Sequence, residues 1–287
     1  MQKRKRVSTF SIVVFSLCLF IIPAITGAKG ATYYVRSDGN DESSGTSWET
    51  AKKTIQRAIN NAGNGDTIIV GSSDGHGDGV YTENVNVAKS LIIKSESGYA
   101  TTTVVAADTN DHVFEITVSN VTIGGEDCGF SIYGATGTDA AAIFLDSTVT
   151  GCTIQDNRCG WDNDHKNYCG IVLYNSNTNT ILNNTSSSST VSGILLLSSS
   201  HNTISGNTLR SNYLGISLSF SNDNTISGNT CNSNRGYGLS LHSSNYNIIY
   251  LNNLSNNSDG NTGVSASTTN TWNSPTPIFY NYTGGSY

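Results

Sequence analysis

Acidic side chains that could act on a ligand gather between residues 146 and 165. Asp156, Asp162, Asp164 and His165 lie close together in the sequence, and Asp146 precedes them. Carboxylate oxygens are ligands for Ca²⁺, and a pair of carboxyl groups can cleave a glycosidic bond. We therefore take all five as candidate catalytic residues, and the aspartates at 156, 162 and 164 as candidate metal ligands, with Ca²⁺ as the one cofactor they suggest. The competing interpretation is a solvated acidic loop, which is the usual state of charged loops in exported proteins.

Aromatic residues accompany these acidic ones. Trp161, Tyr168 and Tyr174 offer flat rings of the kind that line ligand sites. They are candidate ligand-binding residues, with carbohydrate as the expected ligand. The alternative is that such residues only keep an exposed surface in contact with water.

A second acidic loop runs from Asp74 to Gly79 and reads Asp-Gly-His-Gly-Asp-Gly. We interpret it as a solvated glycine turn. Its Gly-His-Gly is similar to a polygalacturonase motif, but the paired aspartates of that family are not found at matching positions.

Two cysteines bracket the stretch Gly160 to Tyr168. We predict a disulfide between these two, Cys159 and Cys169, because export places thiols where disulfides persist. Two alternatives stay open. One is a bridge from Cys152 to Cys128 or Cys169 through the core, and the other is that buried cysteines, Cys231 included, stay free.

The first 28 residues have the pattern of a secretory signal peptide. Four basic residues, Lys3 to Arg6, precede an apolar stretch that ends at Thr26-Gly27-Ala28. We expect cleavage after about Ala28; the alternative is an uncleaved membrane anchor. The protein is therefore expected in the periplasm, at the cell surface or in the medium, with the membrane as a partner only through an uncleaved segment.

Cleavage changes the formal net charge from −6 to −10, because the segment carries four positive charges and no negative ones. A chain this acidic is a poor candidate for binding nucleic acid. We expect no nucleic-acid partner and look instead to carbohydrate or cell-surface components.

A repeat of 22 to 23 residues organises the second half of the chain. Gly170-Ile-Val-Leu, Gly193-Ile-Leu-Leu, Gly215-Ile-Ser-Leu and Gly238-Leu-Ser-Leu share this period. Each repeat holds short alternating apolar runs and no helical period, so a repeat cannot bury its apolar face alone. Stacked coils whose strands pair in parallel would bury it. The expected fold is all-β, a right-handed single-stranded parallel β-helix.

Alternation along these strands places two columns of side chains outward. They are Val172, Leu195, Ser217 and Ser240 in one column, and Asp146, Tyr174, Leu197, Ser219 and His242 in the next. The columns hold one carboxylate and no partner for it, so this regular face offers no catalytic pair. The coil from Ala142 to Gly170 is longer than the others, and such insertions often carry binding functions.

A second phrase shares the period. Asn184, Asn207, Asn229 and Asn252 each follow an isoleucine by three residues. We predict that their amides form a hydrogen-bonded ladder from coil to coil, because each amide is both donor and acceptor. A row of ligand-binding amides is the competing interpretation. Glycosylation sequons at Asn120, Asn253, Asn256 and Asn281 are predicted to lie on the surface.

The predicted boundaries are a signal peptide at 1–28, an N-terminal cap at 29–66, the β-helix at 67–273 and an irregular tail at 274–287. Within the cap, Thr46-Ser-Trp-Glu49 has a capping-box pattern, and apolar residues then recur at helical spacing up to Gly63. We expect a short amphipathic helix that covers the open end of the core.

Three stretches resemble the cap and first coils of pectin-lyase-like β-helix proteins: Trp48 to Ile59, Gly65 to Val70 and Val80 to Val85. The phrase Asn-Thr-Ile-Ser-Gly-Asn-Thr, at 202–208 and 224–230, is similar to the repeats of NosD-like surface proteins of archaea and bacteria. The resemblance covers most of the chain after the signal and implies the fold. It implies no single activity, since this superfamily includes lyases, hydrolases, esterases, epimerases and non-catalytic proteins.

The NosD resemblance also implies a periplasmic accessory role in copper-site maturation. Met1 is the only methionine and leaves with the signal, so the thioether ligands that Cu(I) favours are absent from the mature chain. His201 and His242 lie at different offsets within their repeats, which keeps them from facing each other.

The favoured hypothesis is a secreted or cell-surface protein without catalytic activity that binds carbohydrate or has a structural role. The alternatives are a calcium-assisted polysaccharide lyase or glycoside hydrolase, and a NosD-like periplasmic accessory protein for copper-site maturation.

Overall fold

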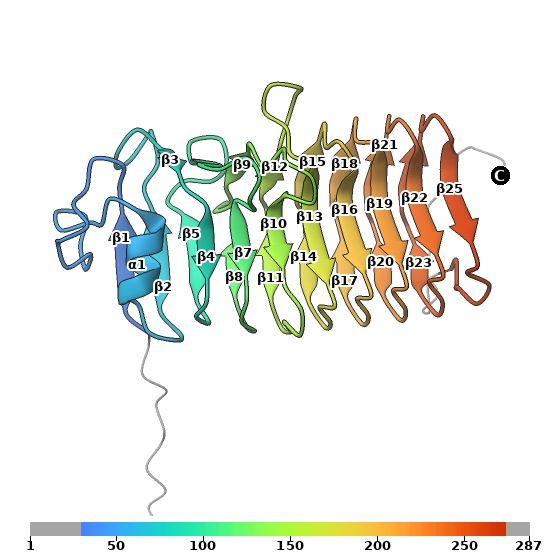
Figure 1. Cartoon of the computed structure of the whole chain (residues 1–287), viewed down its shortest axis with the longest axis horizontal. Coiled ribbons are helices and arrows are strands. Elements are labelled where there is room, and N and C mark those ends of the chain that lie inside the picture. Colours follow the sequence, from blue (N-terminus) through green and yellow to red (C-terminus); the bar gives the residue numbers. More distant parts are fainter. Residues whose placement is uncertain (1–29, 274–287) are drawn as a thin grey trace, which may run out of the picture.

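Three parallel sheets wind together into one straight solenoid in the computed structural model, which describes residues 30–273 (Figure 1). From β2 onward, consecutive strands enter the three sheets in turn, and each strand pairs with its equivalent one coil away. The predicted right-handed parallel β-helix is therefore confirmed. The predicted signal peptide and the tail at 274–287 lie outside the described residues. Between Gly30 and Asn273, no helix has the length and apolar character needed to cross a membrane.

Sheet A contains the first strand and has nine members. They are β1 (Thr32–Val35), β2 (Thr67–Val70), β5 (Ile92–Ser95), β8 (Thr122–Gly124), β11 (Thr153–Gln155), β14 (Thr180–Leu182), β17 (Thr203–Ser205), β20 (Thr225–Ser227) and β23 (Ile248–Tyr250).

Sheet B follows sheet A around each coil and has eight short members. They are β3 (Val80–Thr82), β6 (Thr103–Val105), β9 (Ser131–Tyr133), β12 (Arg158–Cys159), β15 (Thr185–Ser187), β18 (Thr208–Arg210), β21 (Thr230–Asn232) and β24 (Asn253–Ser255).

Sheet C completes each coil, and its later strands are the longest in the molecule. Its members are β4 (Val85–Val87), β7 (Phe114–Ile116), β10 (Ala141–Leu145), β13 (Cys169–Tyr174), β16 (Ser192–Leu197), β19 (Leu214–Ser219), β22 (Tyr237–His242) and β25 (Gly260–Ser265).

The core is a continuous column of aliphatic side chains inside the coils. In sheet A, Ile154, Ile181, Ile204 and Ile226 pair in register on successive strands and are fully buried. β-Branched residues fit such a column because they pack well against neighbours on a pleated strand. The Gly-Ile-x-Leu phrases form the matching column in sheet C, since Ile171, Ile194 and Ile216 pair with one another.

Asparagine ladders hold the corners of the coils. At the corner between sheets A and B, the backbone N–H of Asn184 donates to Oδ1 of Asn207 at 2.8 Å, and its side-chain amide donates to the same oxygen at 3.1 Å. The same two bonds link Asn207 to Asn229, and Asn229 to Asn252. The predicted ladder is present, and it begins one coil earlier, at Asn157.

Two further asparagine ladders stand at the other corners and were not predicted. One runs through residues 179, 202, 224, 247 and 270 between sheets C and A, and the other through 212, 234 and 257 between sheets B and C. Serines add a fourth column, in which the N–H of Ser199 donates to Oγ of Ser221 at 3.0 Å. Cys152 precedes Asn179 in its ladder, because the Cys152 N–H donates to Asn179 Oδ1 at 2.9 Å.

The N-terminal helix is shorter than predicted. Helix α1 spans Ile55–Asn61, and Thr54 caps it by accepting a hydrogen bond from the N–H of Arg57 at 3.2 Å. The capping-box pattern at Thr46–Glu49 therefore does not start the helix and lies in a turn before it. Ile55, Ala58 and Ile59 are buried against the core, so the helix covers the end of the solenoid as expected.

Two features tie this cap to the first coils. Strand β1 precedes α1 and pairs with β2, so the solenoid begins before the predicted boundary at residue 67. Glu83, which follows β3, accepts the N–H groups of Ile55 and Gln56 at 2.8 and 3.0 Å. Burial raises the pKa of the Glu83 carboxyl, and these two bonds at the helix N-terminus oppose that rise.

The ladders predict a large cost for removing one amide. Asn207→Ala would remove the acceptor of the Asn184 backbone N–H and the side-chain donor to the carbonyl of Ile181 in a fully buried corner. We expect the free energy of unfolding to fall by about 2–4 kcal/mol, measured by urea denaturation followed by circular dichroism. Asn163→Ala in an exposed loop is the control and should change stability by less than about 0.5 kcal/mol. Equal midpoints for the two variants would refute the structural role of the ladder.

Candidate ligand groove at the corner of sheets A and B

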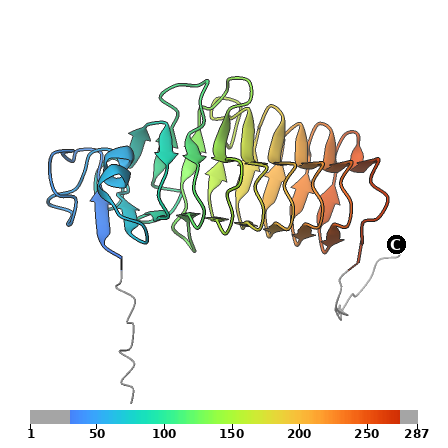
Figure 2. The same cartoon turned by 60° about the horizontal axis from the view of Figure 1, so that its bottom comes forward.

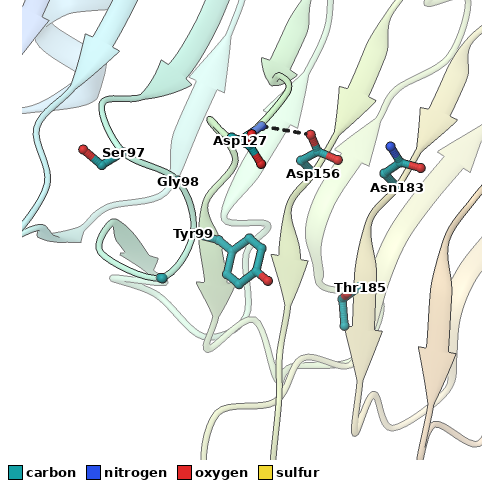
Figure 3. Close-up of a pocket in the computed structure, with 8 residues that line it drawn as sticks. Ser97, Gly98, Tyr99, Asp127, Asp156, Asn183 and Thr185 are labelled. Atoms are coloured by element: carbon teal, nitrogen blue, oxygen red, sulfur yellow. Dashed lines mark hydrogen bonds between the residues drawn. The ribbon is translucent and has the colours of Figure 1, made fainter.

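A groove of about 400 Å³ opens at the corner between sheets A and B. It is lined by the loop that carries Tyr99 and by corner residues of the next three coils. Figure 3 shows Asp127, Asp156 and Asn183 in one row across these coils, with Tyr99 and Thr185 beside them. This row of polar side chains and one ring makes the groove a candidate ligand site.

Backbone geometry turns the row outward. Asp127, Asp156 and Asn183 have φ values of 56°, 56° and 55°, the left-handed conformation that aspartate and asparagine tolerate better than other side chains. Oδ2 of Asp156 accepts the N–H of Asp127 at 3.2 Å and the amide of Gln155 at 3.3 Å. The corner ladder begins at the residues that directly follow Asp156 and Asn183 in the chain, namely Asn157 and Asn184. This ladder fixes the distance between these coils.

An arginine lies between two aromatic rings beside the groove. The guanidinium carbon of Arg158 is 5.2 Å from the centre of the Tyr99 ring and 4.3 Å from that of Trp161. Its Nε donates to Ser131 Oγ at 3.0 Å, and that hydroxyl donates to the carbonyl of Tyr99 at 2.7 Å. Burial lowers the pKa of Arg158 from its usual value, while Tyr99 and Asp162 oppose that shift. These contacts hold the loop of Tyr99 against the next coils, and Tyr99 is 43% exposed.

The inserted loop between β12 and β13 packs on itself. Trp161 stacks on His165 with ring centres 4.3 Å apart, and Tyr133 meets both rings edge-on. Oδ1 of Asp162 accepts the N–H groups of Asp164 and His165 at 3.0 and 2.9 Å and lies 2.8 Å from His165 Nδ1. The bond from His165 lowers the pKa of Asp162. Asp162 therefore stabilises the turn of the loop.

The predicted acidic residues do not come together. Asp156 faces Asp127 in the groove, whereas Asp162 and Asp164 belong to the inserted loop. Asp146 follows β10 in sheet C, where its Oδ1 accepts the N–H of Ser147 at 2.6 Å. Within residues 30–273, no three His, Cys, Asp or Glu side chains are placed to hold a metal ion. The predicted Ca²⁺ ligand set is therefore not assembled.

The predicted aromatic residues divide between two surfaces. Trp161 stands beside the groove through Arg158, but Tyr168 and Tyr174 line a separate hollow on the outer face of sheet C. Sequence reasoning did not identify Tyr99, Asp127 or Thr185, which line the groove. Tyr99 and Asp127 lie in coils whose lengths differ from the 22- to 23-residue period, so no repeat marks them. Thr185 repeats as Thr208 and Thr230 on sheet B, and that column gave no sign of a ligand site.

The glycine-rich loop at 74–79 is a turn with Asp74 and Asp78 exposed, as predicted, and specific contacts also hold it in place. Nδ1 of His76 lies 2.7 Å from Glu96 Oε1, and its ring stacks on Trp48 at 3.9 Å. Glu96 Oε2 also accepts the N–H groups of Ser72 and His76 at 3.2 and 3.1 Å. This cluster fastens the first coil to the N-terminal cap.

All five cysteines of the described residues are free, so the structure departs from the predicted Cys159–Cys169 bridge. The bridge is absent because the two side chains point in different directions. Cys159 points into the main core, whereas Cys169 belongs to a small apolar cluster on the outer face of sheet C. Burial raises the pKa of Cys159 to about 12 and that of Cys169 to about 11.

The predicted glycosylation sites differ from the ladder asparagines in exposure. Asn120, Asn253 and Asn256 are exposed, while Asn184 is fully enclosed in its ladder. Asn281 lies outside the described residues. Modification at these sequons stays a prediction.

A family model described as "Periplasmic copper-binding protein (NosD)" matches residues 59–287. The chain belongs to the NosD family. No match was found among proteins with curated descriptions.

Solved structures share the fold of this NosD-family chain. The periplasmic alginate epimerase AlgG is 16% identical, with a TM-score of 0.52 over 76% of this chain and 52% of its own. The Dettilon tailspike protein is 14% identical, with a TM-score of 0.51 over 77% and 50%. Pectate lyase Pel9A is 12% identical, with a TM-score of 0.51 over 84% and 77%. The chain thus spans about half the length of the epimerase and the tailspike, and identities this low establish the common architecture alone.

A centre for the copper named in the family description would need His, Cys or Met side chains of this NosD-family chain that converge on one point. Two of its histidines are engaged in structural contacts, His76 with Glu96 and His165 with Asp162. His112 stacks on Phe144, and burial lowers its pKa. Four of the five cysteines are buried, and Cys159 and Cys169 point to opposite sides of the wall of their shared coil. The described residues therefore do not fit a copper centre built from one copy of the chain.

Thiol burial predicts selective alkylation. In the native protein at mildly alkaline pH, iodoacetamide should modify Cys128, which is half-buried, and leave Cys159, Cys169 and Cys231 unmodified until urea is added. The raised pKa values and the lack of access both suppress the reactive thiolate. Peptide mass mapping without reductant measures this, and a linked 159–169 peptide would reinstate the bridge.

The donor set predicts weak copper binding. The mature chain, titrated with Cu(I) in competition with a chromogenic chelator, should retain less than one equivalent after desalting. The urea-unfolded chain is the positive control, because its thiols are then accessible. If the folded protein retained one equivalent of Cu(I), the conclusion that its side chains do not form a copper site would be wrong.

Proposed function

We propose that this NosD-family chain is an exported protein without catalytic activity that binds carbohydrate in the groove at the corner of sheets A and B. The observation that carries the proposal is the row of Asp127, Asp156 and Asn183 beside the exposed ring of Tyr99.

The chemistry of the groove matches that of a sugar. A saccharide offers hydroxyl groups at its edge and C–H groups on its face. Carboxylates accept hydrogen bonds from hydroxyls, and the amide of Asn183 and the hydroxyl of Thr185 both donate and accept. The ring of Tyr99 supplies an apolar surface with little conformational entropy to lose. The fixed coil spacing keeps these groups in place before a ligand arrives, which lowers the cost of binding.

Export is part of the proposal. It is supported by the description of the family as periplasmic and by the signal-peptide pattern of residues 1–28. Surface carbohydrate is abundant in these compartments, and the acidic charge of the chain disfavours nucleic acid.

Two aspartates on adjacent coils in one groove also support a second candidate, a glycoside hydrolase or polysaccharide lyase. In this enzyme the catalytic pair would be Asp127 and Asp156. The other acidic residues predicted from the sequence do not join them, because Asp146 belongs to sheet C and Asp162 stabilises a turn. We favour binding, since the described carboxylates do not converge on a metal that would assist elimination.

Glycan binding predicts the effect of removing the ring. On a glycan array and by calorimetry with the best ligand, Tyr99→Ala should weaken binding at least about tenfold, the usual range for an aromatic contact at a binding site. Asp156→Asn should also weaken it, by removing a charged acceptor. Tyr246→Ala is the matched control, because Tyr246 is 63% exposed and far along the solenoid. Equal affinity for Tyr99→Ala and the control would remove the groove from the proposal.

An assay for glycan cleavage distinguishes a binding protein from a glycoside hydrolase or polysaccharide lyase. We expect no new reducing ends and no unsaturated products when the same glycans are incubated with the protein, with or without Ca²⁺. Activity that disappears in both Asp127→Asn and Asp156→Asn would replace the binding proposal with the enzyme.

A further inference from the structure

A second hollow, of about 430 Å³, lies on the outer face of sheet C. Side chains from β10, β13 and β16 line it, chiefly Phe144, Val172, Leu195 and Leu197, with Tyr168 and Tyr174 at its edges. This cluster is separate from the main core, and only its deepest members are buried. It is therefore an apolar surface on the outside of a protein that otherwise exposes mainly polar side chains.

The register shows how local this surface is. Phe144, Val172 and Leu195 pair in one outward column, and the next two strands continue that column with Ser217 and Ser240. On sheet A the outward column reads threonine at positions 153, 180, 203 and 225. Polar residues are thus the rule on outward columns of the later coils, and three strands of sheet C depart from it.

The side chains of the patch are already ordered. The ring of Phe144 stacks on His112 with centres 4.1 Å apart, and Tyr174 lies 6.4 Å from it on the other side. Exposed apolar clusters of this kind, rimmed by polar groups, mark surfaces that bind a protein or a ligand. Val172, Leu195 and Leu197 offer no hydrogen-bonding side-chain atoms, so the patch suits another protein surface better than a sugar.

Charge favours a second copy of the same chain. From β13 to β22, the outward positions paired in sheet C carry no Asp, Glu, Lys or Arg side chain. The carboxylates of this face are Glu115 on β7 and Asp139 and Asp146 at the two ends of β10, and Asp139 lines the edge of the hollow. In a two-fold contact between identical faces, charges near the axis meet their own copies, so an uncharged strip in a chain of net charge −6 avoids that repulsion.

Shape and area agree with this partner. The coils stack in a straight line in both views (Figures 1 and 2), so sheet C runs evenly along the solenoid and can meet an equal sheet along its length. Five strands of sheet C, about 4.8 Å apart and about 20 Å long, present an area on the order of 500 Å². Two such faces bury roughly 1,000 Å², the lower end for specific complexes, which predicts a weak and reversible dimer.

We propose that the outer face of sheet C, from β10 to β22, is the contact surface of a homodimer, with a two-fold axis that sets Leu195 of each copy near Leu195 of the other. The apolar columns then cover each other, and the serines of β19 and β22 allow close approach of the later coils. The sugar groove at the corner of sheets A and B stays open, so the dimer would present two such grooves to one ligand chain.

Sedimentation velocity of the mature chain tests this between about 1 and 200 µM, with an expected dissociation constant of about 10–100 µM. Leu195→Glu places like charges at the axis and should weaken dimerisation at least about tenfold. Ser205→Glu, on the outer face of sheet A, makes the same charge change elsewhere and should leave it unchanged. Mixing Leu195→Glu with Leu195→Lys chains should restore the dimer, because the two residues then attract.

Circular dichroism confirms that each variant is folded. Where Leu195→Glu does not fold, Tyr174→Glu replaces it, since Tyr174 is 44% exposed. A chain that stays monomeric at the highest concentration overturns the proposal, as does a dimer that survives the charge variants or a mixture that fails to associate. Because Leu195 and Tyr174 belong to sheet C and do not line the sugar groove, the effect of their substitution on dimerisation is independent of glycan binding.

Discussion

A corner asparagine inside a ladder of this solenoid, such as Asn207, offers its side-chain oxygen to two donors of the preceding coil, a backbone N–H and an amide N–H. Its own amide reaches a backbone carbonyl of that coil, as Asn184 does with Ile154. A chain that turns sharply three times per coil buries peptide groups that the sheets cannot pair. The asparagines satisfy these groups, and because an amide has one size and one geometry, they also fix the distance between coils.

The surfaces of the molecule depend on that constant spacing. Side chains one position outside the ladder, such as Asp156 and Asn183, are repeated at the same corner and form a row. Side chains that point out of sheet C form straight columns for the same reason. The inserted loop contributes to both surfaces, because Trp161 packs on Arg158 beside the groove and Tyr168 lines the hollow on sheet C. One irregular coil therefore shapes two functional candidates on a regular scaffold.

The regular coils could be predicted from the sequence because the same residues recur in them every 22 to 23 positions. The Gly-Ile-x-Leu phrase and the asparagines that follow each isoleucine by three residues gave the fold, the core column and one of the ladders. The candidate site was harder, since Tyr99 and Asp127 belong to coils of other lengths. The prediction of a disulfide between Cys159 and Cys169 was wrong because the chain turns between them. The side chain of Cys159 points into the core, and that of Cys169 points outward. Proximity in sequence does not reveal which way a side chain faces after a corner.

The strands run across the solenoid axis, so the hydrogen bonds between coils run along it. Tension applied evenly to the two ends of the stack would load all the bonds between neighbouring coils at once, and they would have to break together. Tension applied to the chain beyond β25 would instead open one bond at a time and unwind the last coil first. The same molecule is therefore mechanically stiff as a spacer between two bound surfaces and compliant when pulled by its end.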